Sequence, residues 1–227
     1  MKVVVRGLTK VYTTHQGDLR ALGGINLEVR DREFFGIIGP TGCGKTTLLH
    51  IIGRLETPST GTVQFVGEQS AKSPVAMVFQ EAALMPWRTV EENVPLGAEF
   101  RKEHPSVLKR IGQFFLEIVR LVDFAGARPH ELSGGMKQKV AIARALANDP
   151  PVVIADEPTG NLDSETAQSV VALLDLLTDA GTTVLVATHD YEISRRERNA
   201  SRSVTAGSDW VRWLEIETQG CIETTRR

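Results

Sequence analysis

Short apolar runs alternate with turn residues and with longer amphipathic stretches along the 227-residue chain. Runs of about five residues that are rich in apolar and β-branched side chains, and are bounded by turn residues, are typical of buried strands. This pattern predicts strands at residues 2–6, 25–29, 33–38, 62–66, 75–79, 151–155 and 183–187. The polar loop at residues 13–18 predicts a hairpin-like connection between the first two strands.

The middle of the chain has a different periodicity. Apolar residues recur there at intervals of three and four, at Val107, Leu108, Ile111, Phe114, Phe115, Ile118, Val119 and Val122. This spacing is that of an amphipathic helix. We therefore expect one α/β domain over residues 1–227, with a helical subdomain at about 81–147 inserted into a core and β subdomain at about 1–80 and 148–227. Strands that alternate with helices predict a parallel sheet with right-handed crossovers.

Composition and charge are those of an ordinary globular protein, with 41% hydrophobic and 24% charged residues. The formal net charge is -2, so the chain lacks the excess of basic residues that nucleic-acid-binding proteins have. No nucleic acid partner is therefore expected. Cys43 and Cys221 offer neither a disulfide framework nor a metal-binding spacing, which fits a reducing, cytoplasmic compartment. No apolar run approaches the roughly 18 residues that span a bilayer. Any work at a membrane would therefore require a partner that spans it.

A glycine-rich loop follows the apolar run at 34–38 and precedes a helical run at 47–52. It fits the pattern G-x-x-x-x-G-K-[ST], and its residues are Gly39, Pro40, Thr41, Gly42, Cys43, Gly44, Lys45, Thr46 and Thr47. Its glycines let successive backbone N–H groups point into one concavity, and the helix N-terminus adds partial positive charge. We expect Lys45 to reach the β- and γ-phosphates of a nucleotide and the Thr46 hydroxyl to ligate Mg²⁺.

Two carboxylates follow the apolar run at 151–155. Since a strand directs successive side chains to opposite sides, Asp156 and Glu157 are expected to have different roles. We predict that Asp156 holds Mg²⁺ and that Glu157 is the general base toward the attacking water. The alternative is a pair of solvated carboxylates at the end of a strand.

Residues 132–138 open a predicted helix that runs to about residue 146. Ser133 is a predicted N-cap, and Gly134 and Gly135 leave backbone N–H groups exposed at the positive end of the helix. This would be a second phosphate site in a chain that needs only one for one ATP. Head-to-tail dimerisation accounts for both sites if this helix end faces the nucleotide of the other subunit. The alternative is a plain capped helix.

Two further polar residues follow predicted strands. The side-chain amide of Gln80, after the run at 75–79, is expected to reach the metal or the water from a segment able to swing. His189 follows the run at 183–187, at the carboxyl end where α/β sheets build their sites. We predict that it contacts the γ-phosphate, and a structural histidine is the alternative.

Together these motifs resemble the ATP-binding subunit of an ABC transporter over nearly the whole chain to about residue 190. The resemblance rests on residues 39–47, Gln80, 132–138, 152–157, 160–163 and His189. It implies a P-loop NTPase (RecA-like) core with an antiparallel β subdomain and an inserted α-helical subdomain. It implies ATP hydrolysis with Mg²⁺ and stacking of Tyr12 on adenine. It also implies that Ser133 and Gly135 contact ATP across a dimer and that Asp163 links the two sites.

The resemblance implies three kinds of partner: a second ATP-binding subunit, transmembrane permease subunits that bind the helical subdomain, and a substrate-binding protein. The expected location is the cytoplasmic face of the membrane. Residues 84–87 and 129–136 resemble importers of nitrate, sulfonates and taurine, which favours import of a small solute. Residues 158–163 resemble the lipoprotein-releasing and macrolide-export group, so a lipid, lipoprotein or drug exporter is the alternative. A soluble ABC ATPase of DNA repair or translation is more remote, because such proteins usually carry long coiled-coil or tandem-domain insertions.

Two stretches remain open to more than one interpretation. The apolar stretch at 82–87 is either local core or the lining of a groove for a permease helix, with Trp87 as its aromatic anchor. After His189 the resemblance implies a helix and two short strands, but residues 193–203 are arginine-rich instead. Residues 210–216 and 221–222 are expected to form a hairpin around residues 218–220.

Overall fold

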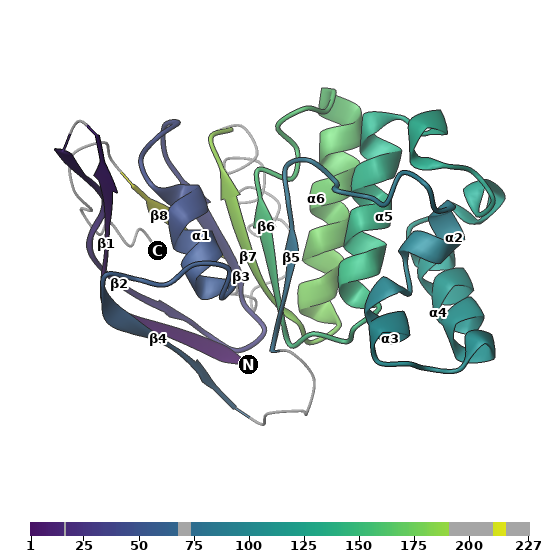
Figure 1. Ribbon diagram of the computed structural model, residues 1–227, viewed down its shortest axis with the longest axis horizontal. Helices are drawn as coiled ribbons and strands as arrows, with labels where there is room; N and C mark the ends of the chain where they lie inside the picture. Colours follow the sequence, from purple (N-terminus) through teal and green to yellow (C-terminus); the bar gives the residue numbers. More distant parts are fainter. Residues whose placement is uncertain (16, 68–73, 191–210, 217–227) are drawn as a thin grey trace, which may run out of the picture.

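The computed structural model describes residues 1–15, 17–67, 74–190 and 211–216. These residues form a small antiparallel sheet and a larger parallel sheet, and helices lie on both sides of the larger one (Figure 1). The helices between residues 90 and 146 gather at the end of the molecule that is far from the small sheet (Figure 1). The predicted α/β architecture is confirmed.

The smaller sheet has the strand order β2-β1-β4. Strands β1 (Lys2–Thr14) and β2 (Gly17–Val29) pair up to Thr14 and Gly17, which confirms the hairpin. Both strands are longer than the predicted runs at 2–6 and 25–29, because their pairing continues through register shifts into polar sequence. Strand β4 (Thr60–Val66) pairs with the other edge of β1.

The larger sheet has the strand order β5-β6-β7-β3-β8, and all its pairings are parallel, as predicted. Its strands are β3 (Phe34–Ile38), β5 (Val75–Val78), β6 (Val152–Asp156), β7 (Thr183–Thr188) and β8 (Val211–Glu215). Strand β8 lies in the predicted run at 210–216, but it pairs with β3 and places Glu215 opposite Ile38. The second strand of the predicted hairpin, at 221–222, lies outside the described residues.

Helix α1 (Lys45–Ile52) packs on one face of the larger sheet, and α5 (Gly134–Leu146) and α6 (Ser164–Asp179) pack on the other (Figure 1). Between β5 and α5 lie α2 (Val90–Asn93), α3 (Leu96–Phe100), α4 (Pro105–Ile118) and the 3-10 turns η1 (Val122–Phe124) and η2 (Pro129–Glu131). No helix among the described residues is both long and apolar enough to cross a bilayer.

The first helix after β5 begins at Val90, so the helical subdomain predicted from about residue 81 opens with a stretch that is not helical. Ala83 has a left-handed backbone with φ 46°, and Pro86 lacks the N–H that a helix interior requires. Residues 79–89 therefore form an irregular segment between β5 and α2.

The central strand β3 shows why the parallel strands are apolar throughout. Phe34 and Ile38 pack in the cluster that contains α5 and α6, whereas Phe35 and Ile37 pack in the cluster that contains α1 and the smaller sheet. A sheet covered on both faces requires apolar side chains at every position. The covered faces leave the strand ends as the places where polar side chains can gather.

Candidate functional site

Several of the predicted site residues follow the carboxyl ends of four adjacent parallel strands. The glycine-rich loop follows β3, His189 follows β7, Glu157 follows β6, and Gln80 lies two residues after β5. Because neighbouring parallel strands end at the same edge, these residues share one side of the larger sheet.

The glycine-rich loop requires left-handed backbone at two of its glycines, Gly42 with φ 85° and Gly44 with φ 99°. Gly44 is the N-cap of α1, and a Cβ there would lie only 2.6 Å from the Ala21 carbonyl oxygen. The Cys43 N–H donates to the Pro40 oxygen at 3.3 Å, which closes the turn. Helix α1 then begins at Lys45, so its free N–H groups face the loop.

Lys45, Glu157 and His189 form one network. The Lys45 side chain is 6% exposed, and its ammonium donates to the Gly39 oxygen at 2.7 Å and the Pro40 oxygen at 3.2 Å. It also lies 3.4 Å from Glu157 Oε1. Glu157 Oε2 accepts the His189 backbone N–H at 3.2 Å and lies 2.8 Å from His189 Nδ1. Three of the four predicted catalytic residues are therefore joined through one carboxylate, and the fourth, Gln80, is not part of this network.

The backbone at Glu157 differs from the prediction. Strand β6 ends at Asp156, and Glu157 has a left-handed φ of 46°, with its N–H bonded to the Ala187 oxygen at 2.9 Å. The two carboxylates do diverge, but a turn separates them and not strand alternation. A non-glycine residue in this conformation carries strain that its surroundings must hold.

Asp156 is buried, and one of its oxygens, Oδ1, has no hydrogen-bond partner. Burial raises the pKa of its carboxyl, and the hydrogen bond with the Thr46 side chain lowers it. A partnerless carboxylate oxygen beside a hydroxyl fits a hard cation such as Mg²⁺, which usually keeps several waters and binds substrate phosphates. Within the described residues no group of three or more His, Cys, Asp or Glu side chains could hold a metal by itself.

Gln80 is exposed, and its side chain packs against the turn that begins at Glu157. The Gly160 N–H donates to the Glu157 oxygen at 3.1 Å, and a Cβ on Gly160 would lie 3.0 Å from Gln80 Nε2. The structure thus brings Gln80 next to the turn that carries the predicted base.

Ser133 and Asp163 cap the neighbouring helices α5 and α6. The Ser133 hydroxyl accepts the Met136 N–H at 3.3 Å, and the Asp163 carboxylate accepts the Thr166 N–H at 2.9 Å. Hydrogen bonds with Thr166 lower the pKa of Asp163. A Cβ on Gly135 would lie 1.9 Å from Thr166 Cγ2, so the glycine lets the two helices approach. Gly134 opens α5 beside them.

Tyr12 lies in β1 and adjoins the glycine-rich loop. Its hydroxyl donates to Glu56 Oε2 at 2.7 Å, and Lys10 Nζ lies 4.9 Å from the centre of its ring. Burial and the Glu56 hydrogen bond raise the pKa of Tyr12, whereas a hydrogen bond with the Thr47 side chain lowers it. Tyr12 therefore contacts the first turn of α1.

Trp87 is 66% exposed, so the interpretation of this residue as local core is wrong. Leu84 of the same stretch does pack partly against the main core. The stretch is held by residues that the sequence reasoning missed, above all the fully buried Asn93 and the half-buried Arg144. The sequence offered no distinctive signal for them, because Asn93 follows two glutamates in α2 and Arg144 shares α5 with other polar residues.

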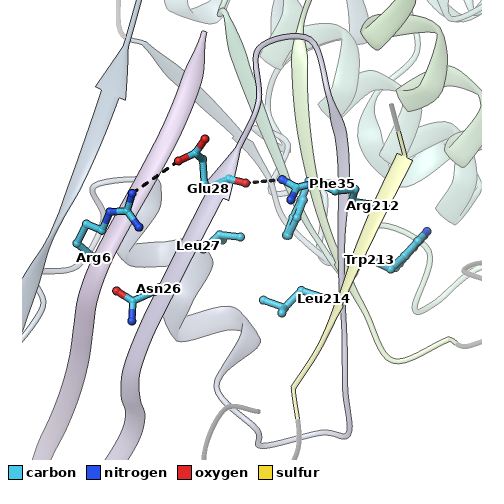
Figure 2. A pocket seen from close by; sticks show the side chains of 8 residues that line it. All are labelled: Arg6, Asn26, Leu27, Glu28, Phe35, Arg212, Trp213 and Leu214. Atoms are coloured by element: carbon cyan, nitrogen blue, oxygen red, sulfur yellow. Dashed lines mark hydrogen bonds and ion pairs between the residues drawn. The ribbon is translucent and has the colours of Figure 1, made fainter. Parts of the chain in front are cut away.

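A separate pocket of ≈ 150 Å³ lies between β2, β3 and β8 and is lined by none of the predicted site residues (Figure 2). Its lining residues are Arg6, Asn26, Leu27, Glu28, Phe35, Arg212, Trp213 and Leu214. Arg212 is bonded to the Glu28 carbonyl oxygen and to the fully buried Glu33. This side of the pocket therefore anchors β8 to the rest of the fold.

A family model described as ABC transporter matches residues 22–160. An uncharacterized ABC transporter ATP-binding protein of Methanocaldococcus jannaschii is 43% identical over 196 residues, which cover 85% of this chain and 73% of that protein. The methionine import ATP-binding protein MetN of Streptomyces coelicolor is 40% identical over 208 residues, 84% of this chain but only 59% of MetN. The cell division ATP-binding protein FtsE of Bacillus subtilis is 39% identical over 196 residues, 82% of this chain and 86% of FtsE.

Among solved structures, the chain is similar to the dimeric ATP-binding cassette MJ0796 in a post-hydrolysis state with ADP and Pi. The TM-score is 0.82 and the identity is 33%, over 99% of both chains.

Proposed function

Because the chain belongs to the ABC transporter ATP-binding family, we propose that it drives the import of a small solute of the nitrate, sulfonate or taurine kind. Its general activity follows from the family: it binds ATP with Mg²⁺ as the usual cation, hydrolyses it, and is the motor of a transporter. We propose three further points: the solute, the direction of transport and the roles of single residues.

The observation that carries the residue roles is the network of Lys45, Glu157 and His189 at the glycine-rich loop. Lys45 exchanges its loop carbonyl partners for phosphate oxygens, since a buried ammonium attracts an anion. Glu157 accepts the proton of the attacking water as general base. His189 orients that carboxylate through Nδ1 and its backbone N–H, and contacts the γ-phosphate.

The metal site is assigned to Asp156, Thr46 and Gln80. The partnerless Oδ1 of Asp156 and the neighbouring Thr46 hydroxyl support this assignment. Mg²⁺, when bound, neutralises negative charge on the β- and γ-phosphates. Gln80 is assigned to the same site because its side chain lies beside the Glu157 turn.

The second subunit completes each nucleotide site in this proposal. Helices α1 and α5 pack on opposite faces of the larger sheet, so the glycine-rich loop and Ser133 belong to different sides of one chain. In a head-to-tail dimer, Ser133, Gly134 and Gly135 face the ATP that the partner holds on its residues 39–47, and Asp163 links the two sites. Dimers occur in the family, as the MJ0796 cassette illustrates.

Permease subunits at the cytoplasmic face of the membrane are the proposed anchor, and the exposed Trp87 is the proposed contact. Two relatives support import: MetN of Streptomyces coelicolor, and a spermidine/putrescine import protein of Acidothermus cellulolyticus that is 42% identical over 196 residues. Export of a lipid, lipoprotein or drug is the second candidate, and the resemblance of residues 158–163 to exporters favours it.

Co-purification and reconstitution separate these functions. The tagged chain is purified from membranes, its companions are identified, and the complex is placed in liposomes. If the chain drives import, a polytopic permease and a substrate-binding protein should co-purify with it. ATP hydrolysis should then rise when the substrate-binding protein carries nitrate, a sulfonate or taurine. Stimulation by a lipoprotein or a macrolide would establish export instead, and association with ribosomes or DNA would contradict both.

A further inference from the structure

The irregular segment at residues 79–89 is held by side chains of other elements. From α5, Gln138 Nε2 donates to the Phe79 oxygen at 2.8 Å, and Arg144 donates to the Ala83 and Ala82 oxygens at 2.7 and 2.9 Å. From α2, the amide of Asn93 bonds the Met85 N–H at 2.7 Å and the Thr89 oxygen at 2.9 Å. The segment owes its shape to these bonds, since it has no regular hydrogen-bond ladder of its own.

The spacing of Gln138 and Arg144 along α5 matches the length of chain that they hold. Gln138 and Arg144 are separated by about 9 Å along the helix axis at 1.5 Å per residue. The chain from Phe79 to Ala82 spans at most about 10–11 Å when extended. The two side chains can therefore hold both ends of this short stretch, and the path of the segment from β5 to α2 crosses α5 in Figure 1. A rigid movement of α5 must carry residues 79–83 with it.

Arg144 is the unusual member of this set because its charge faces only neutral groups. Its guanidinium is half-buried, burial lowers its pKa, and among the described residues no carboxylate lies within ion-pair distance. Its two bonds go to consecutive carbonyls, which converge because Ala83 has a left-handed backbone. The planar guanidinium of arginine carries several N–H donors and can bond two such oxygens at once. The single ammonium of lysine does not match this geometry.

We propose that Arg144 is a positioning residue that couples helix α5 to Gln80 on one side and to Trp87 on the other. This rests on the proposed function, in which the N-terminus of α5 meets the nucleotide of the partner subunit. When that contact moves α5, Arg144 moves the Ala82–Ala83 turn. Gln80 then shifts relative to the Glu157 turn, and Trp87 shifts at the surface that the permease would contact.

The test compares Arg144→Met and Arg144→Lys with Arg110→Met, which removes an exposed arginine of α4. The first readout is the fluorescence of Trp87 in ATP-free protein, obtained as the difference from the same variants carrying Trp87→Phe. Arg144→Met should shift its emission or its acrylamide quenching, with a smaller change for Arg144→Lys and none for Arg110→Met. This readout does not depend on dimer formation, so it separates the role of Arg144 from the proposed contact across the dimer.

The second readout is steady-state ATP hydrolysis. Arg144→Met should lower kcat by roughly 10- to 100-fold, the range that a small misplacement of a reacting group can cost. KM for ATP should stay within about twofold, because Lys45 and its loop are untouched. An unchanged Trp87 signal would overturn the proposal, and so would an unchanged kcat or a loss confined to KM. If Arg144→Met does not fold, Arg144→Lys alone decides by the same criteria.

Discussion

At the scale of single residues, Glu157 is the centre of the site. Its left-handed backbone is uncommon for a residue with a side chain, and its carboxylate lies between the Lys45 ammonium and the His189 ring. Strain of this kind is typical of functional positions. The sequence predicted this residue as the general base, but the turn that places it depends on the bond from its N–H to Ala187 in the neighbouring strand.

Glu157→Gln should retain ATP binding and lose hydrolysis by roughly 10²–10⁴-fold, because the amide keeps the shape but cannot accept the proton of water. The variant should also stay dimeric in ATP. Phosphate release measures the first effect and gel filtration the second. Turnover near the wild-type rate would remove Glu157 from the role of base.

Asp156 should make the ATP-free protein sensitive to pH. Its folded-state pKa is raised, mainly by burial, so its stabilising contribution is present below the unfolded pKa and is lost as the pH rises through the folded pKa. Asp156→Asn should therefore raise the melting temperature at pH 7, by roughly 2–4 °C for each kcal/mol recovered. The gain should shrink as the pH falls toward 4, and the exposed Asp123→Asn is the control. A gain that is independent of pH would show that ionisation of Asp156 is not its cause.

At the scale of elements, α5 joins most parts of the site. Its N-cap is Ser133, its first turn packs on α6 at Gly135, and Gln138 and Arg144 hold residues 79–83. A single helix thus contacts the predicted dimer surface, the second capped helix and the segment that carries Gln80.

Gly135→Ala should destabilise the fold even though alanine favours helix. The helix preference is worth about 1 kcal/mol, but the new Cβ would lie 1.9 Å from Thr166 Cγ2, and overpacking costs roughly 1–3 kcal/mol. Gly134→Ala is the matched control, because its Cβ would meet Leu162 at an ordinary 3.4 Å. Urea unfolding of the ATP-free variants measures both. Equal stability of the two variants would show that α5 and α6 separate without cost.

An element could be predicted when the interactions that form it are between residues close together in the sequence. The parallel strands and the loop at 39–47 were predicted correctly, because burial on both faces and the glycine spacing are visible in short windows of sequence. The irregular backbone of residues 79–89 was not predicted, because Asn93 and Arg144 impose its shape from other elements. The pairing of β8 with β3 was missed for the same reason, since Arg212 reaches Glu33 across 179 positions.

At the scale of the whole molecule, the two helix ends that we propose to bind phosphate lie on opposite faces of the larger sheet, which favours pairing with a second copy of the chain or a close relative. The glycine-rich loop opens α1 on one face of the larger sheet, and Ser133 opens α5 on the other. In the proposed head-to-tail dimer, each ATP lies between the loop of one subunit and Ser133 of the other. Each complete site then depends on residues of both chains.

The most direct test of this account mixes two inactive variants, Ser133→Arg and Lys45→Ala. Ser133→Arg should bind ATP as a monomer but fail to form the ATP-dependent dimer, whereas Lys45→Ala should lose phosphate contacts in its own loop. A mixed dimer would contain one intact site, made of the Lys45 of one chain and the Ser133 of the other, and one doubly damaged site.

The measurement is ATP hydrolysis of the mixture against each variant alone at the same total concentration. The account predicts that activity returns only in the mixture. If the mixture stays inactive while both variants remain folded, or if Ser133→Arg abolishes ATP binding to the monomer, Ser133 does not act on the partner's nucleotide.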